Sequence, residues 1–196
     1  MTLPSLLRSL ALGLGLLCLV TGCRNPDPPK LYPAGEFSLT DQNGARFGSA
    51  ELRGKVWIAA FFFTRCPSVC PKLMARMKTL HADAQGRSLG LRFVAISVDP
   101  ENDTPAVLLE YAKKNDIDTR SWSLLTGDYE TVKKTVIEGF KVALDGKADP
   151  AQADYGILHG SHFVLVDREG QIRGYYRSSD AEETRKLLAD AARISR

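Results

Sequence analysis

The sequence predicts an α/β fold in which a mixed central sheet is flanked by helices. Two continuous apolar, β-prone runs, at 56–63 and 91–98, are typical of strands buried on both faces. Segments with helical periodicity alternate with these runs, and a strand pair with a closing helix follows near the C-terminus. With 196 residues, 44% of them hydrophobic and 25% charged, the composition is that of an ordinary one-domain globular protein. The net charge of +3 is too small and too evenly spread to indicate nucleic-acid binding.

The first 22 residues have the pattern of an export signal. Arg8 is their only charged residue, and the aliphatic run 11–20 that follows is too short to span a bilayer comfortably. The run ends in LVTGC, which resembles the bacterial lipobox, where the cysteine is lipidated and becomes the mature N-terminus. We therefore expect a lipoprotein signal peptide over 1–22 and lipidation of Cys23, on the periplasmic side of a membrane. An uncleaved N-terminal anchor helix is the alternative, and it also keeps the domain outside the cytoplasm.

Residues 23–34 are predicted to form a proline-rich tether, and 35–196 the folded domain. The tether contains four prolines and no apolar periodicity, which is typical of an extended spacer. Of the four cysteines, Cys18 would leave with the signal peptide and Cys23 would carry the lipid. Two free thiols, Cys66 and Cys70, then remain in the domain.

An added β-hairpin is predicted at the start of the domain. Phe37 and Leu39 alternate with polar residues, and Asn43-Gly44 supplies the positive-φ turn between two strands. The apolar run 56–63 follows and predicts a central strand.

Helices and strands alternate after this point. A helix is expected to begin at Pro71, because proline suits the first helical position and apolar residues then recur at helical spacing. The run 91–98 predicts a second buried strand. Further helices are predicted to begin at Thr104-Pro105 and after Asp128, which can act as a cap.

The C-terminal part is predicted to be a hairpin and a helix. Residues 162–166 and 172–176 flank a turn at Glu169-Gly170, and the last helix is expected from about Ala181. A βαβ half followed by a hairpin and a closing helix implies a mixed sheet covered by helices, which is a thioredoxin-like arrangement.

Cys66 and Cys70 lie between the first buried strand and the helix expected at Pro71. In an open α/β sheet, ligands bind at the carboxyl ends of the strands. With Cys70 as the N-cap, its sulfur would face unpaired N–H groups and the positive end of the helix dipole, which favours the thiolate. A thiolate either attacks a disulfide or binds a metal, so both chemistries are candidates.

The three residues between the cysteines leave these candidates open. Thiol–disulfide oxidoreductases usually have two intervening residues. A structural zinc site requires four ligands, commonly from two cysteine pairs, and the domain sequence has only one pair. Soft thiolates with few further ligands suit copper(I) better. A plain structural disulfide between Cys66 and Cys70 in an oxidising compartment is the remaining interpretation.

The chain has three histidines that could supply a further ligand. His81 falls late in the first long helix, where we expect a solvated surface residue. His159 and His162 are three residues apart on a predicted extended segment, so their side chains point to opposite faces and do not share one ion. His159 follows a loop and is freer to orient, so it is favoured over His162.

Three stretches together resemble the Sco/SenC family over nearly the whole domain. They are FFFTRCPSVCP (61–71), SVDPENDTP (97–105), and YGILH with FVLVDREG (155–170). Family members are thioredoxin-like proteins that bind copper through two motif cysteines and a distant histidine. They serve in assembling the CuA centre of cytochrome c oxidase.

The resemblance implies a copper site formed by Cys66, Cys70 and His159. Tyr155, four residues before the histidine, and Gly170 in the following turn match family positions and select His159. Leu158 departs from the family, which often has an acidic or small polar residue there.

The acidic residues after the second strand are left out of this ligand set. Asp99 lies at the same predicted sheet edge as the cysteines, but Asp-Pro at a strand end is typical of turns. Asp103 and Thr104 are explained equally well as helix caps.

We expect a monomeric, membrane-tethered copper chaperone rather than an enzyme, binding Cu(I) or Cu(II). Its expected partners are the copper-bearing subunit of the oxidase or another copper carrier. Oxidation of Cys66 and Cys70 to a disulfide would abolish copper binding. A thiol–disulfide reductase that keeps the oxidase cysteines reduced is the chief alternative, and a thiol peroxidase and a redox or copper sensor are two others.

Overall fold

The structure, a computed structural model, describes residues 26–146 and 158–196. The predicted signal peptide, Cys23 and Tyr155 lie outside the described residues, as do the side chains of Leu158 and His159. Within 26–146 and 158–196, no helix is long and apolar enough to cross a membrane.

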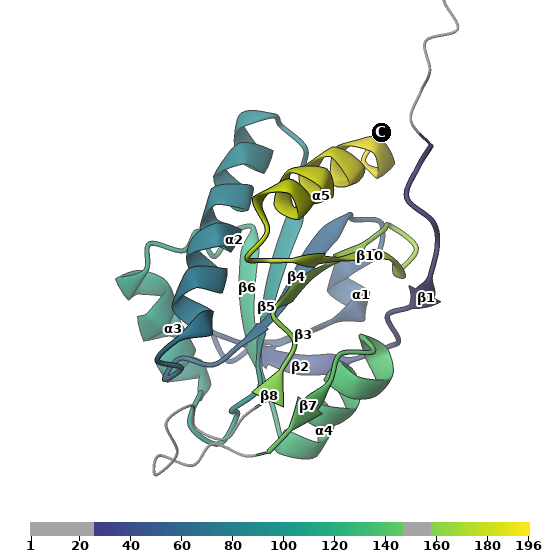
Figure 1. The fold of residues 1–196 in the computed structure, drawn as a ribbon. Coiled ribbons are helices and arrows are strands. Elements are labelled where there is room, and N and C mark those ends of the chain that lie inside the picture. Colours follow the sequence, from purple (N-terminus) through teal and green to yellow (C-terminus); the bar gives the residue numbers. More distant parts are fainter. Residues whose placement is uncertain (1–25, 147–157) are drawn as a thin grey trace, which may run out of the picture.

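Three parallel strands form the centre of an eight-stranded mixed sheet (Figure 1). They are β4 (Trp57–Phe62), β5 (Arg92–Ser97) and β6 (Trp122–Thr126). Every residue of β4 is buried, as its continuous apolar sequence predicts for a strand covered on both faces. The β4 and β5 predictions are confirmed, whereas β6 was not predicted.

Antiparallel strands complete the sheet on both sides, in the order β1-β10-β9-β4-β5-β6-β2-β3. The outer strands are β1 (Tyr32–Pro33), β2 (Ser38–Asp41), β3 (Arg46–Gly48), β9 (His162–Val166) and β10 (Gln171–Arg177). The β2–β3 and β9–β10 pairs confirm the two predicted hairpins. A separate two-stranded sheet joins β7 (Leu144–Asp145) to β8 (Leu158–His159).

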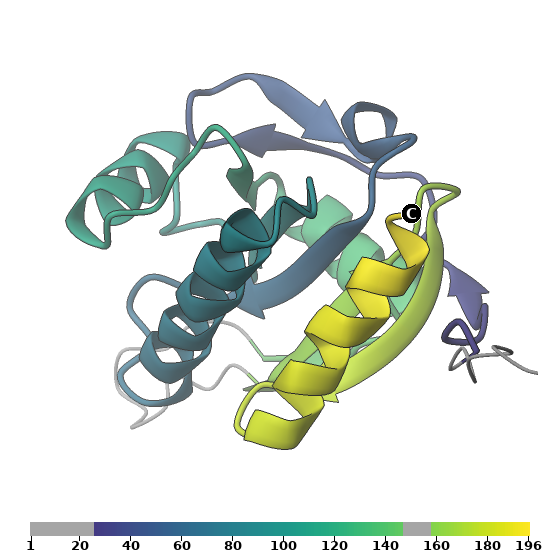
Figure 2. The same cartoon turned by 90° about the horizontal axis from the view of Figure 1, so that it is seen from above.

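Helices cover both faces of the sheet, and α2 and α5 lie side by side over one of them (Figures 1 and 2). The helices are α1 (Ser49–Leu52), α2 (Val69–Gly86), α3 (Pro105–Lys114), α4 (Tyr129–Lys134) and α5 (Ala181–Ile194), with a π-helical turn (Thr135–Gly139) continuing α4. Thr104, Asp128 and Asp180 accept backbone N–H bonds at the starts of α3, α4 and α5.

Side chains of β4 alternate between the two helical layers, because successive residues of a strand point to opposite faces. Trp57 and Phe61 contact the ring of Phe140, which follows the π-helical turn, at centroid distances of 5.7 and 5.2 Å. Phe62 instead contacts Tyr111 of α3 at 5.5 Å. The predicted α/β architecture, a mixed sheet between helices, is therefore confirmed.

Candidate functional site

The cysteine loop leaves the carboxyl end of β4 and enters α2. Ser97 ends the neighbouring parallel strand β5 and pairs with Phe62, so the two strand ends lie at the same edge of the sheet. A cavity of about 500 Å³ opens between α2 and α3 beside this loop. Cys66 and Cys70 both line it, although Cys66 is only 8% exposed and Cys70 1%.

The helix after the loop begins earlier than predicted. Ser68 is the N-cap and Val69 the first residue of α2, so Cys70 and Pro71 are the second and third helical residues. The expectation that the helix begins at Pro71 with Cys70 as its cap is wrong. Proline is tolerated here because the first four N–H groups of a helix have no intrahelical partner, so its missing N–H removes no helical bond.

This shift changes which sulfur the helix start stabilises. The amide of Cys70 donates to the sulfur of Cys66 at 3.4 Å, and the nearby amides of Ser68 and Val69 also favour negative charge on it. Burial alone would raise the pKa of Cys66, but the Cys70 thiol and these amides together lower it below the ordinary value. The favoured thiolate is therefore Cys66.

Cys70 has the opposite tendency, which corrects the prediction that it is the thiolate. Burial raises the pKa of Cys70 strongly, and the neighbouring sulfur of Cys66 and the carboxylate of Asp103 raise it further. Cys66 and Cys70 are not joined by a disulfide in this structure. Of the two thiols, Cys66 therefore loses its proton more readily than Cys70.

Asp103 connects the cysteine loop to the end of β5, and it is not a helix cap as predicted. Its fully buried carboxylate accepts the amide of Thr64 at 3.0 Å and the hydroxyls of Thr64 and Ser97. The helix is capped by Thr104 instead. Burial raises the pKa of Asp103, and the three bonds partly offset this effect.

Asp99 holds the residue directly before Cys66. Its carboxylate, 4% exposed, pairs with Arg65 at 2.9 Å and accepts the side-chain amide of Asn102 at 2.8 Å. Asp99 does lie at the edge expected from the sequence, but its carboxylate is committed to these partners. The exclusion of Asp99 from the ligand set stays a prediction.

Tyr111 forms the opposite wall of the cavity. Its ring packs on Phe62, and burial, with the nearby carboxylate of Asp103 adding to it, raises the pKa of Tyr111 to about 12. The sequence reasoning singled out neither Tyr111 nor Arg65 as part of the site. The position of Arg65 beside Cys66, and of two aspartates after the adjacent parallel strand, was the signal that could have indicated their pairing.

His81 is a core residue, so the expectation of a solvated surface position is wrong. It is 6% exposed, bonds the hydroxyl of Ser121 at 2.7 Å, and packs against the rings of Phe93 and Trp122. Burial lowers the pKa of His81, and the charge of Asp118 opposes this effect.

The two remaining histidines belong to different strands. The backbone of His159 pairs with Leu144 in the small β7–β8 sheet, whereas His162 is the half-buried first residue of β9. Among the residues that the structure describes, no three His, Cys, Asp or Glu side chains are grouped as metal ligands would be. The side chain of His159 is outside that part of the chain.

The family model described as SCO1/SenC matches residues 27–195 of this chain. An SCO2-like protein of Rickettsia felis is 32% identical over 192 residues, and the match covers 92% of each chain.

Solved structures resemble the whole domain. A SCO1/SenC family lipoprotein from Bacillus anthracis has a TM-score of 0.77 and 32% identity, covering 86% of this chain and 98% of that one. BsSco, a Sco-family cytochrome c oxidase assembly protein in which a disulfide switch was identified, has a TM-score of 0.75 and 28% identity, covering 87% and 97%. Bradyrhizobium japonicum ScoI, solved with copper bound, has a TM-score of 0.64 and 30% identity, covering 84% and 99%. The thioredoxin-like fold predicted from the order of elements is confirmed.

Proposed function

The chain belongs to the SCO1/SenC family, and on this premise we propose that it binds copper through Cys66, Cys70 and His159 and assists assembly of the CuA centre of cytochrome c oxidase. Copper is its cargo, which it passes to the copper-bearing subunit of the oxidase or to another carrier. We further propose that the domain is a monomer, attached near Cys23 to the periplasmic side of a membrane.

The reduced cysteine pair at the start of α2 is the observation that carries this proposal. Both sulfurs line one cavity, and soft sulfur ligands suit copper(I). The nearby carboxylates of Asp99 and Asp103 are bound to Arg65, Thr64 and Ser97, so they do not compete as ligands. Bradyrhizobium japonicum ScoI, with 30% identity, has been solved with copper bound.

The topology of the sheet supports His159 as the third ligand. β9 runs antiparallel to β4, with Ala59 opposite Val164. The segment that enters β9 therefore approaches the same edge from which the cysteine loop leaves β4. An imidazole added to two sulfurs suits both copper(II) and copper(I), so this set would accommodate either oxidation state.

Capture and release of copper would depend on the redox state of the pair. Binding as two thiolates requires Cys70 to release its proton. Thiol–disulfide exchange with a disulfide of a partner would transfer two electrons and two protons to that partner, giving it two thiols. A Cys66–Cys70 disulfide would then remain, with no thiolate available for copper. A disulfide switch in BsSco supports this mechanism by similarity.

The same exchange is the basis of the alternative function, a thiol–disulfide reductase acting on the cysteines of the oxidase copper site. The amides at the helix start converge on the sulfur of Cys66, which is the arrangement of an attacking thiolate, with Cys70 as the resolving thiol. A reductase has no use for His159, so this residue distinguishes the two functions.

Anaerobic titration of the reduced chain with copper(I) and copper(II) tests the proposal. Cys66→Ser, Cys70→Ser and His159→Ala should each lose most of the copper affinity. His162→Ala, three residues along the same segment, is the matched control and should bind as the wild type does. Unchanged binding by His159→Ala would remove it from the ligand set and favour the reductase.

The membrane attachment is tested separately. Mass spectrometry of the N-terminal peptide from extracted membranes should show a lipid on Cys23, and Cys23→Ser should release the chain into the soluble fraction. An intact N-terminus in the membrane fraction would instead favour an uncleaved anchor helix.

A further inference from the structure

The segment before the first hairpin, within the extended spacer predicted over 23–34, is bound to the outer edge of the sheet. Tyr32 pairs with Ile172 in the β1–β10 ladder. On either side of β1, the amide of Leu31 donates to Ile172 and that of Ala34 to Gly170, both at 2.9 Å. Residues 31–34 therefore belong to the folded domain.

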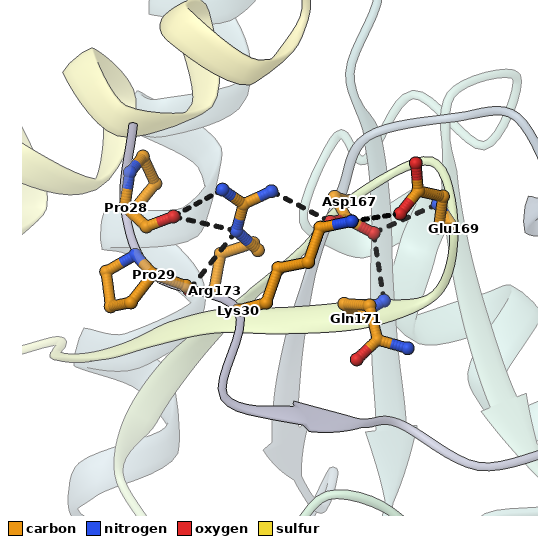
Figure 3. Close-up of polar contacts among 7 residues, drawn as sticks. All are labelled: Pro28, Pro29, Lys30, Asp167, Glu169, Gln171 and Arg173. Atoms are coloured by element: carbon orange, nitrogen blue, oxygen red, sulfur yellow. Dashed lines mark hydrogen bonds and ion pairs between the residues drawn. The ribbon is translucent and has the colours of Figure 1, made fainter. Parts of the chain in front are cut away.

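Arg173 fixes the chain further toward the N-terminus (Figure 3). It lies at a bulge between Ile172 and Gly174, and a bulge redirects the side chain it contains. Its guanidinium donates to the carbonyls of Pro28 and Pro29 and to the carboxylate of Asp167. The side chains of Arg173 and Asp167 are only 10% and 7% exposed.

The β9–β10 turn beside this contact is stabilised by further hydrogen bonds and an ion pair. Asp167 also accepts the amides of Glu169 and Gln171, each at 2.9 Å, and Lys30 pairs with Glu169 (Figure 3). We call the contacts of Pro28–Ala34 with β10 and the β9–β10 turn the clamp. Because of the clamp, the folded unit begins at Pro28.

The clamp leaves a short connection to the proposed membrane attachment. Pro28 is five positions after Cys23, and a chain of that length extends to ~18 Å at most. The 18 residues of α2, which run from the cysteine end of the domain to the opposite end, span ~27 Å. The connection is therefore too short for the domain to turn over and bring its cysteines to the bilayer.

The clamp and the cysteines lie at opposite ends of the sheet. Trp57, the first residue of β4, pairs with Arg92 and Val166, and the β9–β10 turn follows directly. Cys66 follows the other end of β4. In Figure 1 the purple start of the described chain and the C-terminus lie at one end of the molecule, and α2 begins at the other.

Exposed basic side chains gather at the clamp end, which comprises the residues flanking the amino ends of β4 and β5, the β9–β10 turn and the end of α5. Lys55 donates to the carbonyl of Glu51 and Arg168 to that of Ser195. Across 26–146 and 158–196, neither these two nor Arg87 and Arg196 pairs with an acidic side chain. The acidic Glu36, Asp118 and Glu169 are paired with basic residues, whereas Glu51, Asp83 and Asp27, which directly precedes the clamp, have no ion pair within the described part of the chain. The four unpaired basic side chains therefore leave a small positive excess at the clamp end.

We propose that the clamp end is a membrane-binding surface that contacts anionic phospholipid headgroups and directs the cysteine pair away from the bilayer. The proposal rests on the membrane attachment proposed above, and it adds the orientation and the lipid partner. Positive side chains within a Debye length of an anionic bilayer are attracted to it, and salt weakens this attraction. Copper exchange would then occur with a partner whose own site projects from the membrane by about the height of this domain.

Paramagnetic NMR of the full chain in nanodiscs tests the orientation. Nanodiscs of phosphatidylcholine and phosphatidylglycerol would carry a spin label on a fraction of the headgroups. Amides at 87–90 and 168–170 should be broadened strongly, and those at 68–69 and 101–103 weakly. Equal broadening at the two ends, reversed broadening or none would overturn the proposal.

Three variants test whether the connection length and the clamp orient the domain. A flexible ten-residue insertion before Pro26 lengthens the connection without touching the clamp, and should make the broadening at the two ends more nearly equal. Arg173→Gln should do the same and should speed hydrogen exchange at Leu31 and Ala34. Arg177→Gln, an exposed arginine on the same strand, is the control and should change neither measurement. An insertion that leaves the gradient intact would show that connection length does not orient the domain.

The lipid contact has its own test. Replacing Lys55, Arg87 and Arg168 together by glutamine, removing phosphatidylglycerol, or raising the salt concentration should each reduce the broadening at 87–90. A gradient unaffected by all three would overturn the electrostatic contact. Copper titration of the same samples distinguishes failure of the orientation from failure of the proposed function. A domain that binds copper but has no fixed orientation contradicts only the orientation.

Discussion

The amide of Cys70 donates to the sulfur of Cys66 across 3.4 Å, so the first turn of α2 stabilises negative charge on a residue outside the helix. Cys70 itself is inside the helix, 1% exposed, with its pKa raised by burial. Two cysteines four residues apart therefore have different chemistry, and the position at which the helix begins decides which is the thiolate.

Alkylation should detect this difference. Since the thiolate is the nucleophile and the pKa of Cys66 is lowered, Cys66 should react with iodoacetamide first, with a midpoint below 9.0 in its pH profile. Cys70 in Cys66→Ser should react slowly over the same range. Peptide mass mapping of partially alkylated protein measures both rates, and faster labelling of Cys70 would contradict the assignment.

Removing Arg65 alone should destabilise the protein more than removing the charges of both Arg65 and Asp99. Asp99 is buried and Arg65 is about one-third exposed, so Arg65→Gln leaves a buried carboxylate with fewer partners. We expect a loss of about 1–3 kcal/mol in the free energy of unfolding. Adding Asp99→Asn should recover part of it, because the uncompensated charge is then gone. Urea unfolding of both single variants and the double variant measures the coupling; strict additivity would mean that the pair contributes nothing.

His81 should make the protein less stable in mildly acidic solution. Folding lowers its pKa below 6.5, so the unfolded chain binds a proton that the folded chain resists. The free energy of unfolding should then fall as the pH drops below 6.5. His81→Gln removes the titrating group while keeping a partner for Ser121, so its urea midpoint should depend less on pH between 7 and 5. An unchanged pH dependence would exclude His81 as its source.

Gly48 and Gly86 form a matched pair for alanine substitution. A Cβ on Gly48 would lie 2.0 Å from the carbonyl oxygen of Phe37, whereas one on Gly86 would meet nothing within 4 Å. We expect Gly48→Ala to destabilise the domain by about 1–3 kcal/mol. Gly86→Ala, at the end of α2, should be neutral or stabilising by about 0.5–1 kcal/mol, since alanine favours helix. Thermal unfolding distinguishes the two, and similar melting temperatures would contradict the clash.

The central strands and the hairpins could be predicted because their sequences carry the signal themselves. A run such as 56–63 has no polar residue to expose, and Asn43-Gly44 specifies a turn by its backbone preference. β6 was missed because Trp122–Thr126 is short and interrupted by Ser123, and its pairing with β5 on one side and β2 on the other makes it a strand. Its structure is set by a neighbour about 30 residues away in the chain.

The errors at the site have the same origin. The position of Pro71 did not reveal that the helix begins at Val69, because proline fits any position of the first turn. Nor did helical periodicity show that His81 is enclosed by Phe93 and Trp122, which arrive from β5 and β6. Asp103 was taken as a cap since local sequence offers that role, while its partner Thr64 is 39 residues distant.

The clamp also has a consequence for the order in which the protein acquires its structure. Lys30 and Glu169 are 139 residues apart, so the N-terminal segment finds its place only after nearly the entire chain has been synthesised. Until then residues 28–34 have no edge to pair with. They are therefore accessible to proteases until the clamp closes, and closure shields them afterwards.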